Sequence, residues 1–129
     1  MGVSMPLVNI LLAEGKSEHY INSVADGVHD ALMETWSIPA LDRFHLIKEY
    51  KKEFFNINKK MWDIERSDDV IVFQIISSPR TKDEKLDFYK RLPEILYEKV
   101  KLRPEDVFIN IVTSNKEDWS FGNGLAQLL

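Results

Sequence analysis

The chain has 129 residues, of which 44% are hydrophobic and 29% are charged, a balance typical of globular proteins. A net charge of −4 and an isoelectric point near 5.4 give no basic surface for nucleic acid or anionic membranes. The absence of cysteine excludes disulfides and thiolate catalysis, and no apolar run approaches the roughly 18 residues that span a bilayer, so we expect a soluble, cytoplasmic protein.

Four short stretches rich in Val, Ile, Leu and Phe predict strands, and two segments with apolar residues at helical spacing predict helices. In chain order these are strand Leu7–Leu12, helix Glu18–Trp36, strand Phe44–Ile47, strand Val70–Ile76, helix Lys82–Val100 and strand Val107–Val112. Ser17 is a suitable N-cap for the first helix, and Thr81 with Glu84 has the spacing of a capping box. Pro93 is expected to kink the second helix or to end it early.

The order of elements is β-α-β, a long polar connector over residues 49–69, and β-α-β again. Leu7 and Val70 are 63 residues apart, as are Phe44 and Val107, which indicates a duplication. We therefore expect the α/β (α+β) class, with two tandem β-α-β units forming a four-stranded mixed sheet. Right-handed crossovers place both helices on one face of that sheet. The whole chain, residues 1–129, is predicted to form a single domain.

Side chains alternate along the predicted strands, so the sheet has two different faces. One face is wholly apolar and carries Val8, Ile10, Leu12, Ile71, Phe73, Ile75, Val107, Ile109 and Ile111. The other is mostly apolar with one amide on each of three strands, at Asn9, Gln74 and Asn110. Two helices cover only one face, and a bare apolar patch of that size is usually buried against partners. We therefore expect a homo-oligomer.

Pro6 stands at the start of the first strand, directly after a second methionine, Met5. If residues 1–5 are a removable leader or an extension ahead of the true start, Pro6 becomes the N-terminal residue. Its nitrogen is then a secondary amine that can act as base, acid or nucleophile. Inside a chain the same nitrogen is an amide without a basic lone pair, and Pro6 is simply a residue that a strand start tolerates. We favour the first interpretation.

Arg80 lies next to the Thr81 cap, where the guanidinium and the helix N-terminus together suit a carboxylate. The alternative is a solvated loop arginine. Asp42 precedes the second strand, where it could pair with Arg43 or end a turn. Two aromatic residues lie near glycines after the last strand, in a segment that suits a pocket wall or an interface: Trp119 and Phe121. No phosphate-binding loop or metal-ligand spacing is present, so no cofactor or metal is expected.

With these residues assembled, the chain resembles the tautomerase superfamily and, within it, the malonate semialdehyde decarboxylase group. The resemblance runs from about Met5 to the end of the chain, and its most specific feature is the block of residues 118–122. It is carried by Met5-Pro6-Leu7-Val8, Asp42-Arg43-Phe44, Arg66-Ser67-Asp68-Asp69, Ser78-Pro79-Arg80, Arg103-Pro104-Glu105-Asp106-Val107 and Asp118-Trp119-Ser120-Phe121-Gly122. It implies a trimer of duplicated β-α-β subunits.

The resemblance also implies roles for individual residues. Pro6 maps to the acid–base group, Asp42 to an aspartate that orients or activates water, and Arg80 to an arginine that binds the substrate carboxylate. The decarboxylases use two arginines two residues apart, and Ser78 stands at the first of these positions here. An aromatic wall maps to two residues near the C-terminus, Trp119 and Phe121.

The favoured function is keto–enol tautomerisation of a small oxo-carboxylate. Its catalytic residues are Pro6, Asp42 and Arg80, and its substrate-binding residues are Ser78, Arg80, Trp119 and Phe121. The runner-up is decarboxylation or hydration of a malonate semialdehyde-type substrate. The alternative of another class is a non-catalytic, oligomeric interaction subunit in which Pro6 is blocked. A small oxo acid and further copies of the chain are the expected partners, without nucleic acid or membrane.

Overall fold

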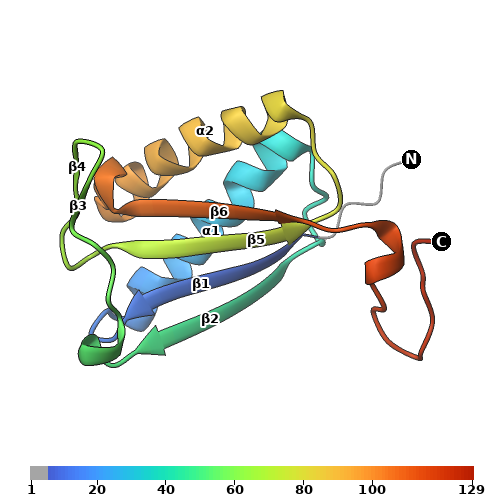
Figure 1. Cartoon of the computed structure of the whole chain (residues 1–129), viewed down its shortest axis with the longest axis horizontal. Helices are drawn as coiled ribbons and strands as arrows, with labels where there is room; N and C mark the ends of the chain where they lie inside the picture. Colours follow the sequence, from blue (N-terminus) through green and yellow to red (C-terminus); the bar gives the residue numbers. More distant parts are fainter. Residues whose placement is uncertain (1–5) are drawn as a thin grey trace.

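The computed structural model describes residues 6–129, and it contains a four-stranded mixed sheet with two long helices on one face (Figure 1). Residues 1–5, the expected leader, lie outside the described residues. The main elements are β1 (Leu7–Ala13), α1 (Glu18–Trp36), β2 (Phe44–Tyr50), β5 (Ile71–Ser77), α2 (Lys82–Val100) and β6 (Val107–Thr113). Smaller elements are the 3-10 helices η1 (Lys52–Phe54), η2 (Pro104–Asp106) and η3 (Lys116–Asp118), and a hairpin of β3 (Lys60–Met61) and β4 (Ile64–Glu65).

The sheet has the strand order β2-β1-β5-β6. β1 runs parallel to β2 and β5 runs parallel to β6, while the central pair β1 and β5 is antiparallel. β1 and β5 begin at residues 7 and 71, α1 and α2 at 18 and 82, and β2 and β6 at 44 and 107. The predicted class and the predicted pair of β-α-β units are therefore confirmed.

The core lies between the sheet and the two helices. The central strands present fully buried side chains to the helices, which in turn contribute apolar residues from their facing sides. The strand residues are Val8, Ile10, Phe73 and Ile75, and the helix residues are Val24, Val28, Leu32, Phe88, Leu92 and Leu96. The helices pack closely at Gly27, where an added Cβ would lie 2.8 Å from Cδ2 of Leu96. No helix within residues 6–129 combines the length and apolar character needed to cross a membrane.

Three features differ from expectation. α2 continues through Pro93 to Val100, so an early end of this helix is wrong. Buried side chains on both sides of the proline, including Leu92 and Leu96, hold the helix against the core and outweigh the missing hydrogen bond. β2 extends to Tyr50 because its pairing with β1 continues that far. The hairpin β3–β4 was not predicted, and its turn is formed by two residues with positive φ, Trp62 and Asp63.

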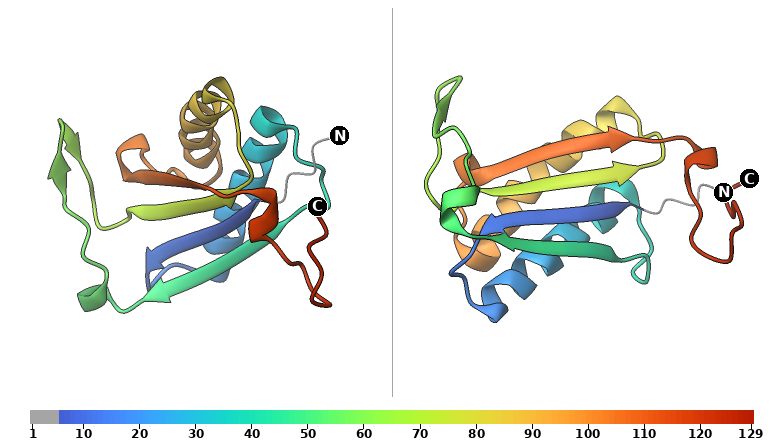
Figure 2. Two further views of the ribbon diagram at one scale, coloured as in Figure 1. Left: turned by 45° about the vertical axis from the view of Figure 1, so that its right-hand side comes forward. Right: turned by 60° about the horizontal axis from the view of Figure 1, so that its bottom comes forward.

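The second face of the sheet is not covered by the helices, which both lie on the other side (Figure 2). Leu46 on this face is 57% exposed, and Phe44 and Val112 are each 39% exposed. The amides predicted for this face lie side by side, with Asn9 donating to Gln74 at 3.2 Å and Gln74 donating to Asn110 at 3.4 Å. The mixed, largely apolar face expected from the sequence is thus present and open in the single subunit.

Candidate active site

The predicted site residues come from segments that meet at one end of the sheet. β1 and β2 begin at this end, and β5 and β6 finish there because the two halves are antiparallel. The loop before β2 and the chain after β6 can be followed at this end in Figure 2. Six residues lie in these segments: Pro6, Asp42, Ser78, Arg80, Trp119 and Phe121.

Pro6 is buried and directly precedes β1. Leu7 lies opposite Ile76 in the antiparallel pair, so Pro6 falls at the level of Ser77. Ser77 is 1% exposed, and its hydroxyl donates a hydrogen bond of 2.7 Å to the carbonyl of Ser78. The turn that leads to Arg80 is therefore held in place beside Pro6. The Ser78 residue itself is half-buried.

Arg80 is not a solvated loop arginine, since its side chain is only 10% exposed. Nη1 donates to the carbonyl of Trp36 at 3.2 Å and lies 3.5 Å from Oε2 of Glu84. The guanidinium carbon lies 4.9 Å from the centroid of the Trp36 ring. Nε and Nη2 are buried and have no hydrogen-bond acceptor within residues 6–129. Burial lowers the pKa of Arg80, while the neighbouring Glu84 opposes that change.

Trp36 and Glu84 complete the surroundings of Arg80, and neither was predicted as a site residue. The indole Nε1 of Trp36 donates to the carbonyl of Glu84 at 3.0 Å. Glu84 also accepts from the Thr81 backbone N–H at 2.9 Å, which completes the predicted capping box. Hydrogen bonds from Thr81 lower the pKa of Glu84. The capping box was readable from the sequence, whereas Trp36 looked only like the last residue of an apolar helix.

The two predicted aromatic residues stack on one another, with ring centroids 5.5 Å apart and an angle of 17° between the planes of Trp119 and Phe121. Trp119 Nε1 donates to Oγ of Ser114 at 2.7 Å. The Ser114 backbone N–H in turn donates to the carbonyl of Ser77 at 2.8 Å. The aromatic pair is therefore connected to the strand ends next to Pro6, through a serine that no sequence pattern marked.

Asp42 ends a turn before β2, one of the two outcomes expected for it. Its backbone N–H donates to the carbonyl of Pro39 at 3.0 Å. The ion pair of Arg43 is with Asp26, at 2.7 Å. His29, buried on α1, has its Nε2 2.8 Å from the Ala40 carbonyl, and because that carbonyl can only accept, Nε2 is the donor. This contact ties the Asp42 turn to α1.

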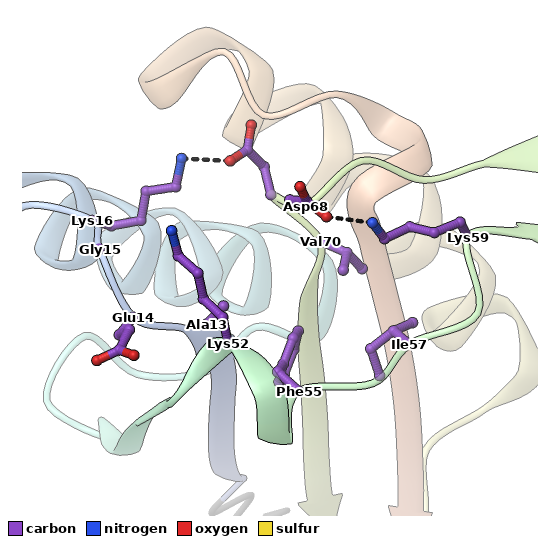
Figure 3. Close-up of a pocket in the computed structure, with 11 residues that line it drawn as sticks. Ala13, Glu14, Gly15, Lys16, Lys52, Phe55, Ile57, Lys59, Asp68 and Val70 are labelled. Atoms are coloured by element: carbon purple, nitrogen blue, oxygen red, sulfur yellow. Dashed lines mark hydrogen bonds and ion pairs between the residues drawn. The ribbon is translucent and has the colours of Figure 1, made fainter.

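A cavity of about 280 Å³ lies at the opposite end of the sheet, where β1 ends and β5 begins (Figure 3). Two of its three lysines pair with acidic residues of the same cavity, Lys16 with Asp69 at 2.6 Å and Lys59 with Asp68, while Lys52 has no ion pair within residues 6–129. Its apolar lining residues include Phe55, Ile57 and Val70. None of the predicted site residues lines it. Within residues 6–129, no three His, Asp or Glu side chains gather in a way that could hold a metal ion.

Two family models, both described as Tautomerase enzyme, match the chain over residues 6–63 and 42–122. Among curated proteins, Probable tautomerase YusQ of Bacillus subtilis (strain 168) is 32% identical over 126 residues, which cover 97% of this chain and 99% of that protein. Sequence similarity therefore extends over nearly the whole of both proteins.

Solved structures are likewise similar to this chain over nearly its whole length. A malonate semialdehyde decarboxylase with decarboxylase and hydratase activities superimposes with a TM-score of 0.89 and 30% identity, over 95% of each chain. A second malonate semialdehyde decarboxylase, inhibited by 3-bromopropiolate, gives a TM-score of 0.86 and 32% identity over 94% of this chain and 92% of that one. A fused 4-OT described as an asymmetric trimer shares the fold, with a TM-score of 0.76 and 19% identity over 94% of this chain and 96% of that one.

Proposed function

Because the chain belongs to the tautomerase family, we propose that it is an enzyme that moves a proton between carbon and oxygen of a small oxo-carboxylate. In this proposal Pro6 is the acid–base group and Arg80 binds the substrate carboxylate. The observation that carries it is the pair of buried nitrogens on Arg80, Nε and Nη2, which lack an acceptor within residues 6–129. Arg80 lies three residues after Ser77, which is at the level of Pro6 in the sheet, so the two groups come from neighbouring segments.

The free nitrogens of Arg80 suit a carboxylate in both geometry and energy. Nε and Nη2 form one edge of the guanidinium, which can donate two parallel hydrogen bonds to the two oxygens of a carboxylate. A buried donor without an acceptor costs about 1–3 kcal/mol, and a bound carboxylate removes that cost. Both nitrogens are covered by protein atoms in this conformation. Binding therefore requires a local opening around Arg80, and the two charge-assisted hydrogen bonds offset the free-energy cost of that opening.

The proposed chemistry requires Pro6 to be the N-terminal residue, so we propose that residues 1–5 are a removable leader. Tautomerisation needs a base that takes a proton from one atom and an acid that returns it to another. The neutral secondary amine of an N-terminal proline can perform both steps in sequence. The position of Pro6 is buried, and burial disfavours the charged form of an amine. Burial therefore favours the neutral form of this amine, which is the form that accepts a proton.

We propose that the remaining predicted residues bind and enclose the substrate. The Ser78 hydroxyl can donate to an oxygen of the substrate at the position where related decarboxylases have a first arginine. Trp119 and Phe121, stacked and connected to Ser114, form an apolar wall that limits the length of the substrate. A single guanidinium and a short wall favour a small monocarboxylate.

A second candidate is decarboxylation or hydration of a malonate semialdehyde-type substrate. A protonated Pro6 would then polarise the carbonyl, and Asp42 would guide water. Two observations favour it: the similarity to malonate semialdehyde decarboxylases over 94% or more of the chain, and the inhibition of one of them by a small carboxylate, 3-bromopropiolate. Ser78 argues against it as the main activity, because one guanidinium neutralises less charge than two.

We also propose that the chain forms a homotrimer. The uncovered sheet face carries exposed apolar residues, with Leu46 at 57% and Phe44 at 39%. Apolar surface of this kind on a regular sheet is usually covered by a partner. A similar fold, that of the fused 4-OT, occurs as a trimer. The amides Asn9 and Gln74 give the same face polar groups that can fix the register between copies.

The test compares a protein that begins at Pro6 with the full-length chain, which keeps the Pro6 nitrogen as an amide. Exchange of the C3 protons of 2-oxobutanoate in D₂O, followed by proton NMR, measures the proton transfer. We expect exchange by the Pro6-started form alone. Arg80→Gln in that form should lower kcat/KM by about 10- to 150-fold, the equivalent of about 1.5–3 kcal/mol for hydrogen bonds to a charged group. Arg80→Lys should recover part of the loss, because an ammonium lacks the planar fork.

The outcomes separate the candidates. Equal exchange by both forms would mean that a group other than Pro6 transfers the proton. Release of CO₂ from malonate semialdehyde without exchange of 2-oxobutanoate would favour the second candidate. A Pro6-started protein that assembles but performs neither reaction would favour a non-catalytic interaction subunit, as would a mature N-terminus at Met1 or Gly2 in the host.

A further inference from the structure

Trp36 occupies a fixed position between the two helices. It is the last residue of α1 and is 2% exposed. Its indole N–H donates to the Glu84 carbonyl in the first turn of α2, at 3.0 Å. Its ring lies 5.4 Å from the ring of the buried Phe88. A side chain held by a hydrogen bond, by ring packing and by burial has little freedom to rotate.

Trp36 contacts Arg80 with both its ring and its backbone. The ring centroid lies 4.9 Å from the guanidinium carbon, within the distance for a cation–π contact. The Trp36 carbonyl accepts from Nη1 of Arg80 at 3.2 Å, and Glu84 approaches the same nitrogen at 3.5 Å. These contacts all engage Nη1 or the face of the guanidinium. The two nitrogens without an acceptor in residues 6–129, Nε and Nη2, are on the opposite edge.

We infer that Trp36 is a positioning residue, which holds the guanidinium of Arg80 so that its Nε–Nη2 edge receives the carboxylate of the substrate. This inference rests on the proposed role of Arg80. A guanidinium fixed in one plane selects a planar carboxylate lying in that plane. It also loses less conformational freedom on binding than a mobile arginine does. One arginine fixed in this way can therefore anchor a substrate although Ser78 replaces a second one.

If Trp36 positions Arg80, substitutions of Trp36 should weaken the binding of a small carboxylate to different degrees. Trp36→Leu removes the cation–π contact and the hydrogen bond to Glu84, so the affinity for a small carboxylate should fall. A cation–π contact corresponds to roughly a 2- to 30-fold change in affinity. Trp36→Phe keeps a ring beside Arg80 and should lose less. Phe88→Leu is the matched control, because Phe88 is also buried and packs against Trp36, while the ring that lies over the Arg80 guanidinium is that of Trp36.

The experiment titrates the Pro6-started protein with oxamate, a small carboxylate that cannot tautomerise through carbon. The NMR signal of the Arg80 Nε–H, assigned by its loss in Arg80→Gln, reports the bound edge directly. We expect oxamate to shift this signal, with the affinity reduced most in Trp36→Leu, partly retained in Trp36→Phe and least affected in Phe88→Leu. Thermal unfolding of each variant establishes that the titrated protein is folded.

Three results would overturn the inference: oxamate binding that leaves the Arg80 Nε–H signal unmoved, no oxamate binding at all, or an equal loss of affinity in Phe88→Leu and Trp36→Leu. The readout does not depend on turnover. If the protein binds oxamate through Nε of Arg80 but does not exchange the protons of 2-oxobutanoate, the role of Trp36 stands and the proposed proton transfer is wrong.

Discussion

We expect His45 to make the stability of this protein depend on pH. It lies in β2 next to Val8 of β1, and neither of its ring nitrogens has a hydrogen-bond partner within residues 6–129. Burial lowers the pKa of His45 from 6.5 to about 4, with smaller contributions in the same direction from Arg43 and His29. Asp26 acts in the opposite direction. The folded protein therefore resists protonation of this histidine.

The sign of the effect follows from proton binding. Between pH 6.5 and about 4 the unfolded chain binds a proton on His45 that the folded chain does not, so unfolding becomes more favourable as pH falls through this range. The full contribution is present above pH 6.5. The difference in pKa corresponds to about 3 kcal/mol. Because the ring is partly exposed and solvent screens it, we expect about 1–2 kcal/mol.

Urea unfolding of the wild type and His45→Leu between pH 7 and 4.5 measures this contribution, since other titrating groups are common to both proteins. The free energy of unfolding of the wild type should fall by about 1–2 kcal/mol more than that of His45→Leu. Arg43→Gln removes a cation that lowers the pKa of His45, so it should raise this pKa part of the way and give an intermediate dependence. Parallel curves for the wild type and His45→Leu would refute this account of His45.

Two further predictions concern packing and assembly. Gly27→Ala places a Cβ 2.8 Å from Cδ2 of the fully buried Leu96. Urea unfolding should therefore show that the free energy of unfolding falls by about 1–3 kcal/mol, despite the better helix propensity of alanine. An unchanged free energy of unfolding would contradict the close helix contact. Sedimentation equilibrium at micromolar concentration should show a trimer, and Leu46→Glu on the open face should shift it toward a folded monomer; a well-folded monomeric wild type would refute the assembly.

The helices were predictable from local chemistry. Both α1 and α2 begin and end at the expected residues, because Ser17 and the Thr81–Glu84 capping box mark their starts and apolar spacing marks their length. Of the two outcomes expected at Pro93, the early end of α2 did not occur, because the proline penalty is local while the burial that outweighs it comes from the sheet and the other helix. The end of β2 was predicted three residues early, because Lys48 and Glu49 are polar. They belong to the strand because they pair with β1, and that pairing depends on the tertiary structure.

The candidate site was predictable only in part. Sequence located Arg80 beside a helix start but gave no indication that the side chain is buried, because its covering residue Trp36 is 44 positions away. Likewise, the bond from the Ser114 backbone to the Ser77 carbonyl, which connects the aromatic pair to β5, depends on where β6 ends relative to β5. Spacing rules capture contacts within one element. Contacts between the last turn of one helix and the first turn of the other require the fold.

The two ends of the sheet differ in how their charges are satisfied. At the end with the cavity, two of the three lysines pair with aspartates, as Lys16 does with Asp69 at 2.6 Å, and Arg66 has one buried nitrogen, Nε, without an acceptor in residues 6–129. At the end with Pro6, Arg80 is nearly buried and keeps two donors for which residues 6–129 supply no acceptor. Folding alone gives no reason to retain donors in that condition, since each costs about 1–3 kcal/mol. Under the proposed chemistry the substrate carboxylate is the missing acceptor for Nε and Nη2 of Arg80.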